Sequence, residues 1–186
     1  MAKPFKSYTE HALTKTEYKR LLQAANTLEE EVMLRIAVGL GLRRLDLSKI
    51  KISNIDLDER KITYHEHKKN RDRTLPITRS LEQLLRKYIN TLPKKRVYLF
   101  PWGESKYGDF TAYRRLQDLC NRAGIKGRPF HSLRGTCYKF CKDRGWSVEQ
   151  AAYMLGDSIR TAQEHYGVPS PAEITELVER IDDDEV

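Results

Sequence analysis

The chain has 186 residues, a length that suits one ordinary domain, and 39% hydrophobic residues supply enough apolar material for one core. Charged residues make up 32% and the formal net charge is +8, which favours an anionic partner such as the phosphate backbone of nucleic acid. No apolar run approaches the roughly 20 residues that a membrane-spanning helix needs. Three cysteines without a signal peptide argue against a disulfide framework and for the reducing cytoplasm.

Helices are expected in the first quarter of the chain. Residues 1–13 have no clear period and predict an extended leading segment. Thr14 is a suitable N-cap for a helix whose apolar positions follow at helical spacing: Tyr18, Leu21, Leu22 and Ala25. Residues 29–40 predict a second helix that is apolar nearly all round, as a buried central helix would be, and residues 46–50 predict a short third.

The period then changes to that of short strands. Apolar residues at 52, 55 and 57, at 62 and 64, and at 75 and 77 predict a small antiparallel sheet. The almost entirely charged turn 68–73 should project into solvent or onto a polyanion. Helical spacing resumes at 81–88 and, after a break at 98–101, at 113–120. The predicted fold class is therefore mainly α with a small antiparallel β-sheet.

Four separated segments carry the residues of greatest chemical interest. Arg43 lies in the first, at 41–47, and Lys68 falls in the charged turn when 75–77 is taken as a hydrophobic-Pro-hydrophobic strand. The third is a His-x-x-Arg motif formed by His131 and Arg134. The fourth is Leu-Gly-Asp-Ser at 155–158, with Tyr166 nine residues after its aspartate.

In this order and spacing the four segments resemble the catalytic domain of the tyrosine recombinases, the phage integrase family that includes the Xer-like enzymes. The resemblance covers roughly residues 13–169 and includes Tyr-Leu-Phe-Pro at 98–101. It implies the DNA breaking-rejoining fold and a single catalytic domain over 1–186, with a leading segment at 1–13 and a C-terminal helix and acidic tail at 170–186. The N-terminal core-binding domain usual in the family is absent, as in an excised catalytic domain or a naturally short protein.

The resemblance also implies a reaction. Tyr166 would attack a DNA phosphodiester and form a covalent 3′-phosphotyrosyl intermediate, which keeps the bond energy for rejoining without ATP. Arg43 and Arg134 would clamp the non-bridging oxygens, since each guanidinium offers a planar fork of donors. Lys68 would protonate the leaving oxygen, and His131 would take the tyrosine proton or hydrogen-bond the phosphate. No metal and no cofactor is implied. The implied partners are double-stranded DNA at a specific recombination site and further protomers of a homo-tetramer.

Other residues have secondary assignments. Asp157 stands where the family usually has histidine, and it could orient Arg134 or His131 while Arg160 or His165 supplies the missing donor. Asp46 is expected to fix Arg43 or to act as an N-cap. The remaining basic residues near the first arginine and in the turn are candidates for contacts to DNA: Arg44, Lys69, Arg71 and Arg73.

Each of these residues also has an ordinary interpretation. Arg43 could cap a helix end, the basic turn could be a solvated loop, and Tyr166 could be an interfacial aromatic. His65 and His67 share a strand face that permits metal binding, although no third ligand supports zinc. The amphipathic segment 169–181 could dock on a neighbouring protomer or pack on its own domain.

Two rival functions remain open at this point. A catalytically inactive integrase-like protein could bind DNA and regulate recombination, in which case Tyr166 would be dispensable. A type IB topoisomerase-like enzyme would use the same intermediate to relax supercoils with little site preference.

Overall fold

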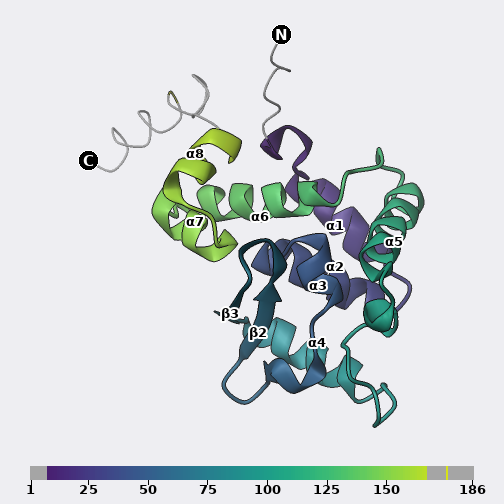
Figure 1. Ribbon diagram of the computed structural model, residues 1–186. Coiled ribbons are helices and arrows are strands. Elements are labelled where there is room, and N and C mark those ends of the chain that lie inside the picture. Colours follow the sequence, from purple (N-terminus) through teal and green to yellow (C-terminus); the bar gives the residue numbers. More distant parts are fainter. Residues whose placement is uncertain (1–7, 167–174, 176–186) are drawn as a thin grey trace.

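The computed structural model describes residues 8–166 and residue 175, and it confirms a mainly helical fold with one small sheet (Figure 1). The α-helices are α1 Lys15–Ala24, α2 Leu28–Leu40, α3 Arg44–Ser48, α4 Arg79–Ile89, α5 Gly108–Arg122, α6 His131–Asp143, α7 Val148–Leu155 and α8 Ile159–Tyr166. The strands are β1 Ile55–Asp56, β2 Lys61–Glu66 and β3 Arg71–Pro76, and short 3-10 turns are η1 Tyr8–His11, η2 Ile52–Asn54, η3 His67–Lys69 and η4 Pro101–Glu104. No helix in this described part is long and apolar enough to cross a bilayer.

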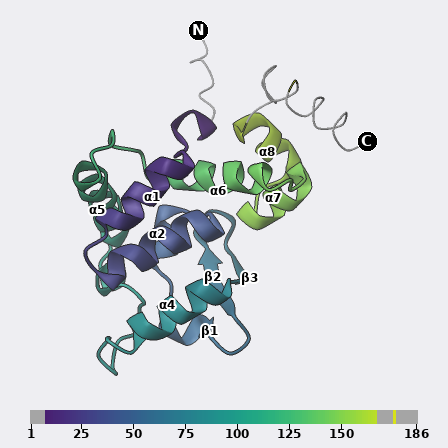
Figure 2. The same ribbon diagram turned by 180° about the vertical axis from the view of Figure 1, so that it is seen from behind.

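Helix α2 forms the centre of the core, as its apolar sequence predicted. Thr27 caps it by accepting from the Glu30 amide, and most of its side chains are buried. It packs against α6 on one side and α4 on the other, and Figure 2 shows it between these two helices. One partly exposed strip carries the ion pair of Glu31 and Arg35, and burial of the other sides explains why the rest of the helix is apolar.

The sheet has the order β1-β2-β3 and is antiparallel throughout, as expected. Ile62 pairs with Leu75 and both are buried, so the apolar face of the sheet points into the core. Asn70 closes the β2–β3 hairpin in the left-handed region, with φ of 46°. Ile52, predicted as a strand residue, lies in η2 instead.

The start of the described chain is anchored to α6. Thr14 and Glu17 form a capping box on α1, which confirms Thr14 as the N-cap. The Leu13 amide donates to Thr136 Oγ1 at 2.8 Å, and both residues are buried. The leading segment was predicted to be extended, but Tyr8–His11 forms a 3-10 turn, because it packs on α6.

Helices α7 and α8 pack at one end of α6 around a second apolar cluster (Figure 1). The predicted core stripe of α7 is confirmed, since Ala151, Ala152 and Leu155 are buried in this cluster. All three cysteines are buried free thiols. The amphipathic segment 169–181 lies outside the described residues, apart from Thr175.

Candidate active site

The first arginine of the candidate site follows the sharp end of α2. Gly41 terminates the helix with φ of 63°, and a Cβ there would lie 2.2 Å from Leu155 Cδ2. Glycine is therefore required both by the backbone and by the close approach of α7. The chain turns at this point, and Arg43 becomes the residue before the first turn of α3.

Two carboxylates hold the Arg43 guanidinium. Nη1 donates to Glu66 Oε1 at 2.6 Å, and Nη2 donates to Asp157 Oδ1 at 3.1 Å. The arginine side chain is 25% exposed, whereas the carboxylate side chains are 1% and 6% exposed. Arg43 thus presents one edge to solvent while the other is fixed from β2 and from the loop after α7.

Arg134 lies in the first turn of α6 and converges on the same carboxylate. Its Nη2 donates to Asp157 Oδ2 at 2.8 Å and to the Leu155 carbonyl at 2.5 Å, and Nη1 donates to the Gly41 carbonyl at 2.6 Å. Asp157 therefore bridges Arg43 and Arg134, with one oxygen for each guanidinium. The expectation that Asp157 orients Arg134 matches this geometry, and Asp157 orients Arg43 as well.

Asp46 does not have the predicted partner. It is buried, and one of its oxygens accepts from the His67 amide at 3.0 Å and lies 2.9 Å from His67 Nδ1. The side chain makes no cap of α3, and the carboxylates on Arg43 are those of Glu66 and Asp157. The prediction that Asp46 fixes Arg43 or caps a helix is wrong, because the amide and ring of His67 in the hairpin turn contact its carboxylate.

The charged turn is folded back on the protein to a greater extent than predicted. Lys69 donates to the Gly156 carbonyl, Arg71 donates to the same carbonyl at 3.2 Å, and Arg73 donates to Tyr64 Oη at 2.9 Å and to main-chain carbonyls of α7. Main-chain carbonyls at a helix C-terminus lack helical partners and carry partial negative charge, so they attract these cations. The hairpin tip therefore closes on the end of α7 (Figure 1).

Lys68 differs from its neighbours in the turn. It is exposed in η3, and no hydrogen bond or ion pair joins it to another described residue. Glu66, two residues earlier, holds Arg43, so the backbone that carries Lys68 is tied to the first arginine. The Lys68 ammonium is therefore available to a ligand, whereas Lys69 is used within the fold.

His131 is the first residue of α6 and is exposed. Partial burial lowers the pKa of His131 below its ordinary value, and the nearby His11 lowers it further. At neutral pH the imidazole is consequently mostly uncharged, which is the state that accepts a proton. It stands three residues before Arg134 on the same helix, at the helix N-terminus.

The remaining predicted site residues either form contacts outside the Arg43–Arg134 pair or have side chains that the structure does not describe. Arg44 pairs with Asp109 at 2.9 Å and stacks on the Phe110 ring, with 36% of its side chain exposed. Arg160 donates to Glu164 at 2.7 Å. The backbone of α8 extends through His165 and Tyr166, but their side chains lie outside the described residues.

Glu66 is the site residue that the sequence reasoning missed. Its signal was the register of β2, where Ile62, Tyr64 and Glu66 share the buried face. A carboxylate on the inward side of a strand requires a partner. The basic turn that follows Glu66 indicates an arginine as that partner.

The structure brings no metal ligand set together among the residues it describes, where no three His, Cys, Asp or Glu side chains cluster suitably. His65 and His67 stack edge to face with ring centroids 4.9 Å apart. His65 Nδ1 lies 2.8 Å from Asp72 and His67 Nδ1 lies 2.9 Å from Asp46. Each ring is thus used in a local pair.

Comparison with known proteins bears on this arrangement. The sequence model of the phage integrase family matches residues 11–170. The tyrosine recombinase XerA of Pyrococcus furiosus is 26% identical over 175 residues, which are 91% of this chain and 61% of that protein. XerA of Saccharolobus solfataricus is 31% identical over 153 residues, which are 82% of this chain and 50% of that protein. The chain therefore spans about half to three-fifths of the length of these relatives.

Solved structures of similar fold include a crystal structure of XerA recombinase, with a TM-score of 0.76, 24% identity and coverage of 97% of this chain and 65% of the other. A lambda integrase dimer bound to a COC′ core site gives a TM-score of 0.66 at 20% identity, covering 92% of this chain and 64% of the other. A post-cleavage complex of XerH site-specific recombinase bound to difH substrate gives 0.68 at 19% identity, covering 95% and 53%.

Proposed function

The chain belongs to the phage integrase family, and from this membership we propose that it is a site-specific recombinase that cleaves and rejoins DNA strands through a covalent bond to Tyr166. The observation that carries the proposal is the convergence of Arg43 and Arg134, far apart in sequence, on the two oxygens of Asp157. Two guanidinium groups held this close can share one phosphate, which is an anion of similar oxygen spacing.

The proposed reaction begins with attack by the phenol oxygen of Tyr166 on the scissile phosphorus. The oxygen loses its proton to the neutral imidazole of His131, and the bond from phosphorus to the 5′ oxygen breaks. Arg43 and Arg134 stabilise the negative charge that grows on the non-bridging oxygens. Lys68 gives a proton to the leaving 5′ oxygen, so a 5′ hydroxyl and a 3′-phosphotyrosyl bond result. Reversal with a different 5′ hydroxyl rejoins the strand.

The proposed partner is duplex DNA, with the protein located with that DNA in the cytoplasm. The net charge of +8 supports an anionic partner. The lambda integrase match is a dimer bound to a core site, which supports assembly on DNA. We extend this to four protomers acting on two duplexes. Each protomer supplies one phosphate clamp, formed by Arg43 and Arg134, and the basic residues that flank this clamp are Arg44, Lys69, Arg71 and Arg73.

Covalent trapping tests the proposal. The substrate is a nicked suicide duplex whose site has been selected by binding from a randomised library, and the products are separated on a denaturing gel. The parent chain is expected to form a protein–DNA adduct, and Tyr166→Phe is expected to form none because it lacks the attacking oxygen. Tyr107→Phe is the matched control, since Tyr107 is 64% exposed and immediately precedes α5, a helix that carries no residue of the proposed reaction.

A specific observation favours a second candidate, a DNA-binding protein without catalysis. Asp157 and Glu66 already occupy one donor on each terminal nitrogen of Arg43, and their negative charges oppose the approach of a phosphate. Binding of the selected duplex without any adduct would support this candidate. Relaxation of supercoiled plasmid without recombinant products would instead indicate the topoisomerase-like activity.

A further inference from the structure

Glu66 has no part in the reaction just described, yet it contacts two cations of the site. Its Oε1 accepts from Arg43 Nη1 at 2.6 Å, and its Oε2 accepts from Arg71 Nε at 2.7 Å. The residue is fully buried at the C-terminal end of β2. Each oxygen therefore serves a different arginine, and the carboxylate lies between the first arginine of the clamp and the hairpin.

The charge state of this carboxylate follows from its partners. Burial opposes ionisation, but hydrogen bonds from Arg71 and Arg43 outweigh it and hold the pKa of Glu66 below its ordinary value. Glu66 is consequently ionised at neutral pH. An ionised group is costly to bury unless both oxygens are satisfied, and here they are.

Arg43 would be poorly oriented without this contact. A free arginine side chain carries about 2 kcal/mol of rotamer entropy, which binding of a phosphate would have to overcome. Glu66 holds Nη1 and Asp157 holds Nη2, so the plane of the guanidinium is set before DNA arrives. The donors not used by these carboxylates keep a fixed direction, which is the preorganisation that transition-state stabilisation requires.

The same contact joins Arg43 to the general acid. Glu66 ends β2, and Lys68 follows two residues later in η3. Asp46 fixes the intervening His67 through its amide and ring. A displacement of the hairpin tip is therefore transmitted to Arg43 over a short stretch of backbone.

We propose that Glu66 is a positioning residue for strand cleavage, which fixes the guanidinium plane of Arg43 and couples it to the hairpin that carries Lys68. This inference rests on the function proposed above. The competing explanation is that Glu66 only stabilises the fold, as many buried carboxylates paired with arginine do.

The test compares two scissile groups in the same nicked suicide duplex. One is the natural phosphate, and the other is a methylphosphonate, in which a methyl group replaces a non-bridging oxygen and removes the negative charge. Glu66→Gln is expected to slow cleavage of the phosphate by roughly 10- to 100-fold, because a misplaced clamp has a cost of that order. Its dissociation constant for the duplex should stay within about 3-fold of the parent value. The contact of Arg43 with the phosphate is stronger in the transition state than in the bound substrate, so its loss lowers the rate more than the affinity.

Cleavage of the methylphosphonate should be much less sensitive, since a neutral group depends less on Arg43. Arg43→Ala combined with Glu66→Gln should cleave the phosphate no more slowly than Arg43→Ala alone, because both changes remove the same interaction. A fold defect would slow both substrates alike and would add to the loss from Arg43→Ala.

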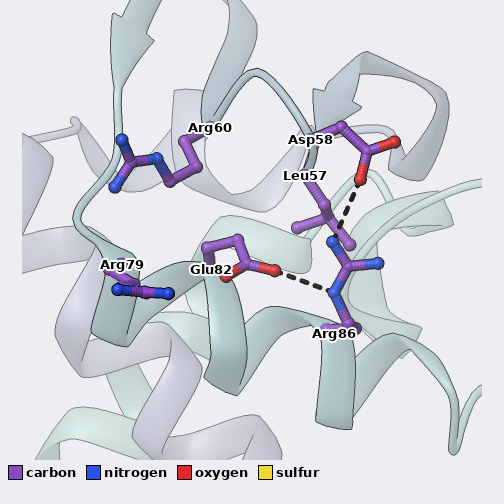
Figure 3. A pocket seen from close by; sticks show the side chains of 6 residues that line it. All are labelled: Leu57, Asp58, Arg60, Arg79, Glu82 and Arg86. Carbon is purple, nitrogen blue, oxygen red and sulfur yellow. Dashed lines mark hydrogen bonds and ion pairs between the residues drawn. The ribbon is translucent and has the colours of Figure 1, made fainter.

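Glu82→Gln is the matched control (Figure 3). Glu82 is 13% exposed and accepts from Arg86 Nε at 2.8 Å in a pocket of about 400 Å³ between α4 and the turn before β2. The pocket lies at the opposite end of β2 from Glu66, about 20 Å away for a six-residue strand. Glu82→Gln should cleave both substrates like the parent.

Three results would overturn the positioning role: parent-like cleavage by Glu66→Gln, an equal loss on both substrates, or a loss that adds to that of Arg43→Ala. A parent chain that forms no Tyr166-dependent adduct would overturn the proposed function and this inference together. The two failures are thus told apart by the parent reaction.

Discussion

Asp157 is held from two sides by guanidinium groups, and its side chain is only 6% exposed. Replacing it with asparagine would remove the carboxylate that pairs with the buried Arg134. We expect Asp157→Asn to lower the free energy of unfolding by about 3 kcal/mol, the usual cost of breaking a buried ion pair from one side. Urea unfolding measures this, and added duplex DNA should restore more stability to the variant than to the parent.

The control for that experiment is Asp72→Asn, because Asp72 is 73% exposed and pairs with His65 on the surface. It should change the free energy of unfolding by less than about 0.5 kcal/mol. Equal stability of the two variants would show that Asp157 is not needed to hold the arginines.

Single residues were predicted unevenly from the sequence. Arg43, His131 and Arg134 were singled out as candidates because their motifs have fixed spacing, and the structure places Arg43 and Arg134 on one carboxylate. Glu66 was missed and the partner of Asp46 was misassigned. A carboxylate among 26 acidic residues acquires a partner only when the strands and the hairpin turn set which donors face it.

The end of α7 shows how an element is held in place. Gly156 has φ of 69°, and a Cβ there would lie 2.5 Å from Arg73 Nη1. Gly156→Ala should therefore cost about 1 kcal/mol for the backbone and a further loss from displacing Arg73 from the α7 carbonyls. Chemical denaturation of the parent and variant measures the total.

Gly145→Ala isolates the backbone part, because Gly145 also has positive φ, of 81°, and a Cβ there meets nothing within 4 Å. Gly156→Ala should be the more destabilising of the two, and the excess should disappear when Arg73 is alanine in both. An equal effect at the two glycines would mean that Arg73 does not hold α7.

Most regular elements were predictable from local sequence, whereas the short turns were not. Helix α2 and the β2–β3 hairpin follow from apolar spacing and capping residues. The turn Tyr8–His11 exists because α6 lies beside it, and Ile52 leaves the strand pattern in η2. Contacts with segments far away in the chain cannot be predicted from a local window of sequence.

At the scale of the whole molecule, the positive charge should govern binding to duplex DNA. The logarithm of the association constant should fall linearly with the logarithm of salt concentration, with a slope of about −0.9 per phosphate contacted. Lys68→Ala should make that slope less steep by the amount of about one phosphate contact, because Lys68 is exposed and makes no bond to the described residues. Fluorescence anisotropy over a salt series measures it.

Lys87→Ala removes the same charge from an exposed position on α4, a helix on the far side of α2 from α6. It should leave the slope unchanged. If both lysines change the slope equally, the DNA is held by diffuse attraction and not at the hairpin. Net charge could be predicted from composition, but the face that carries it depends on which segments the fold brings together.

The bridge from Asp157 to Arg43 spans 114 residues of chain, and this has a consequence for synthesis. At roughly 5–20 residues per second, a ribosome releases the second residue of that pair several seconds or more after the first. Until then the clamp lacks its bridging carboxylate, and the segment that carries Tyr166 has not yet been made. On the proposed mechanism, a stalled or prematurely terminated chain would lack the attacking oxygen of Tyr166, so it could not cleave DNA that its basic residues attract.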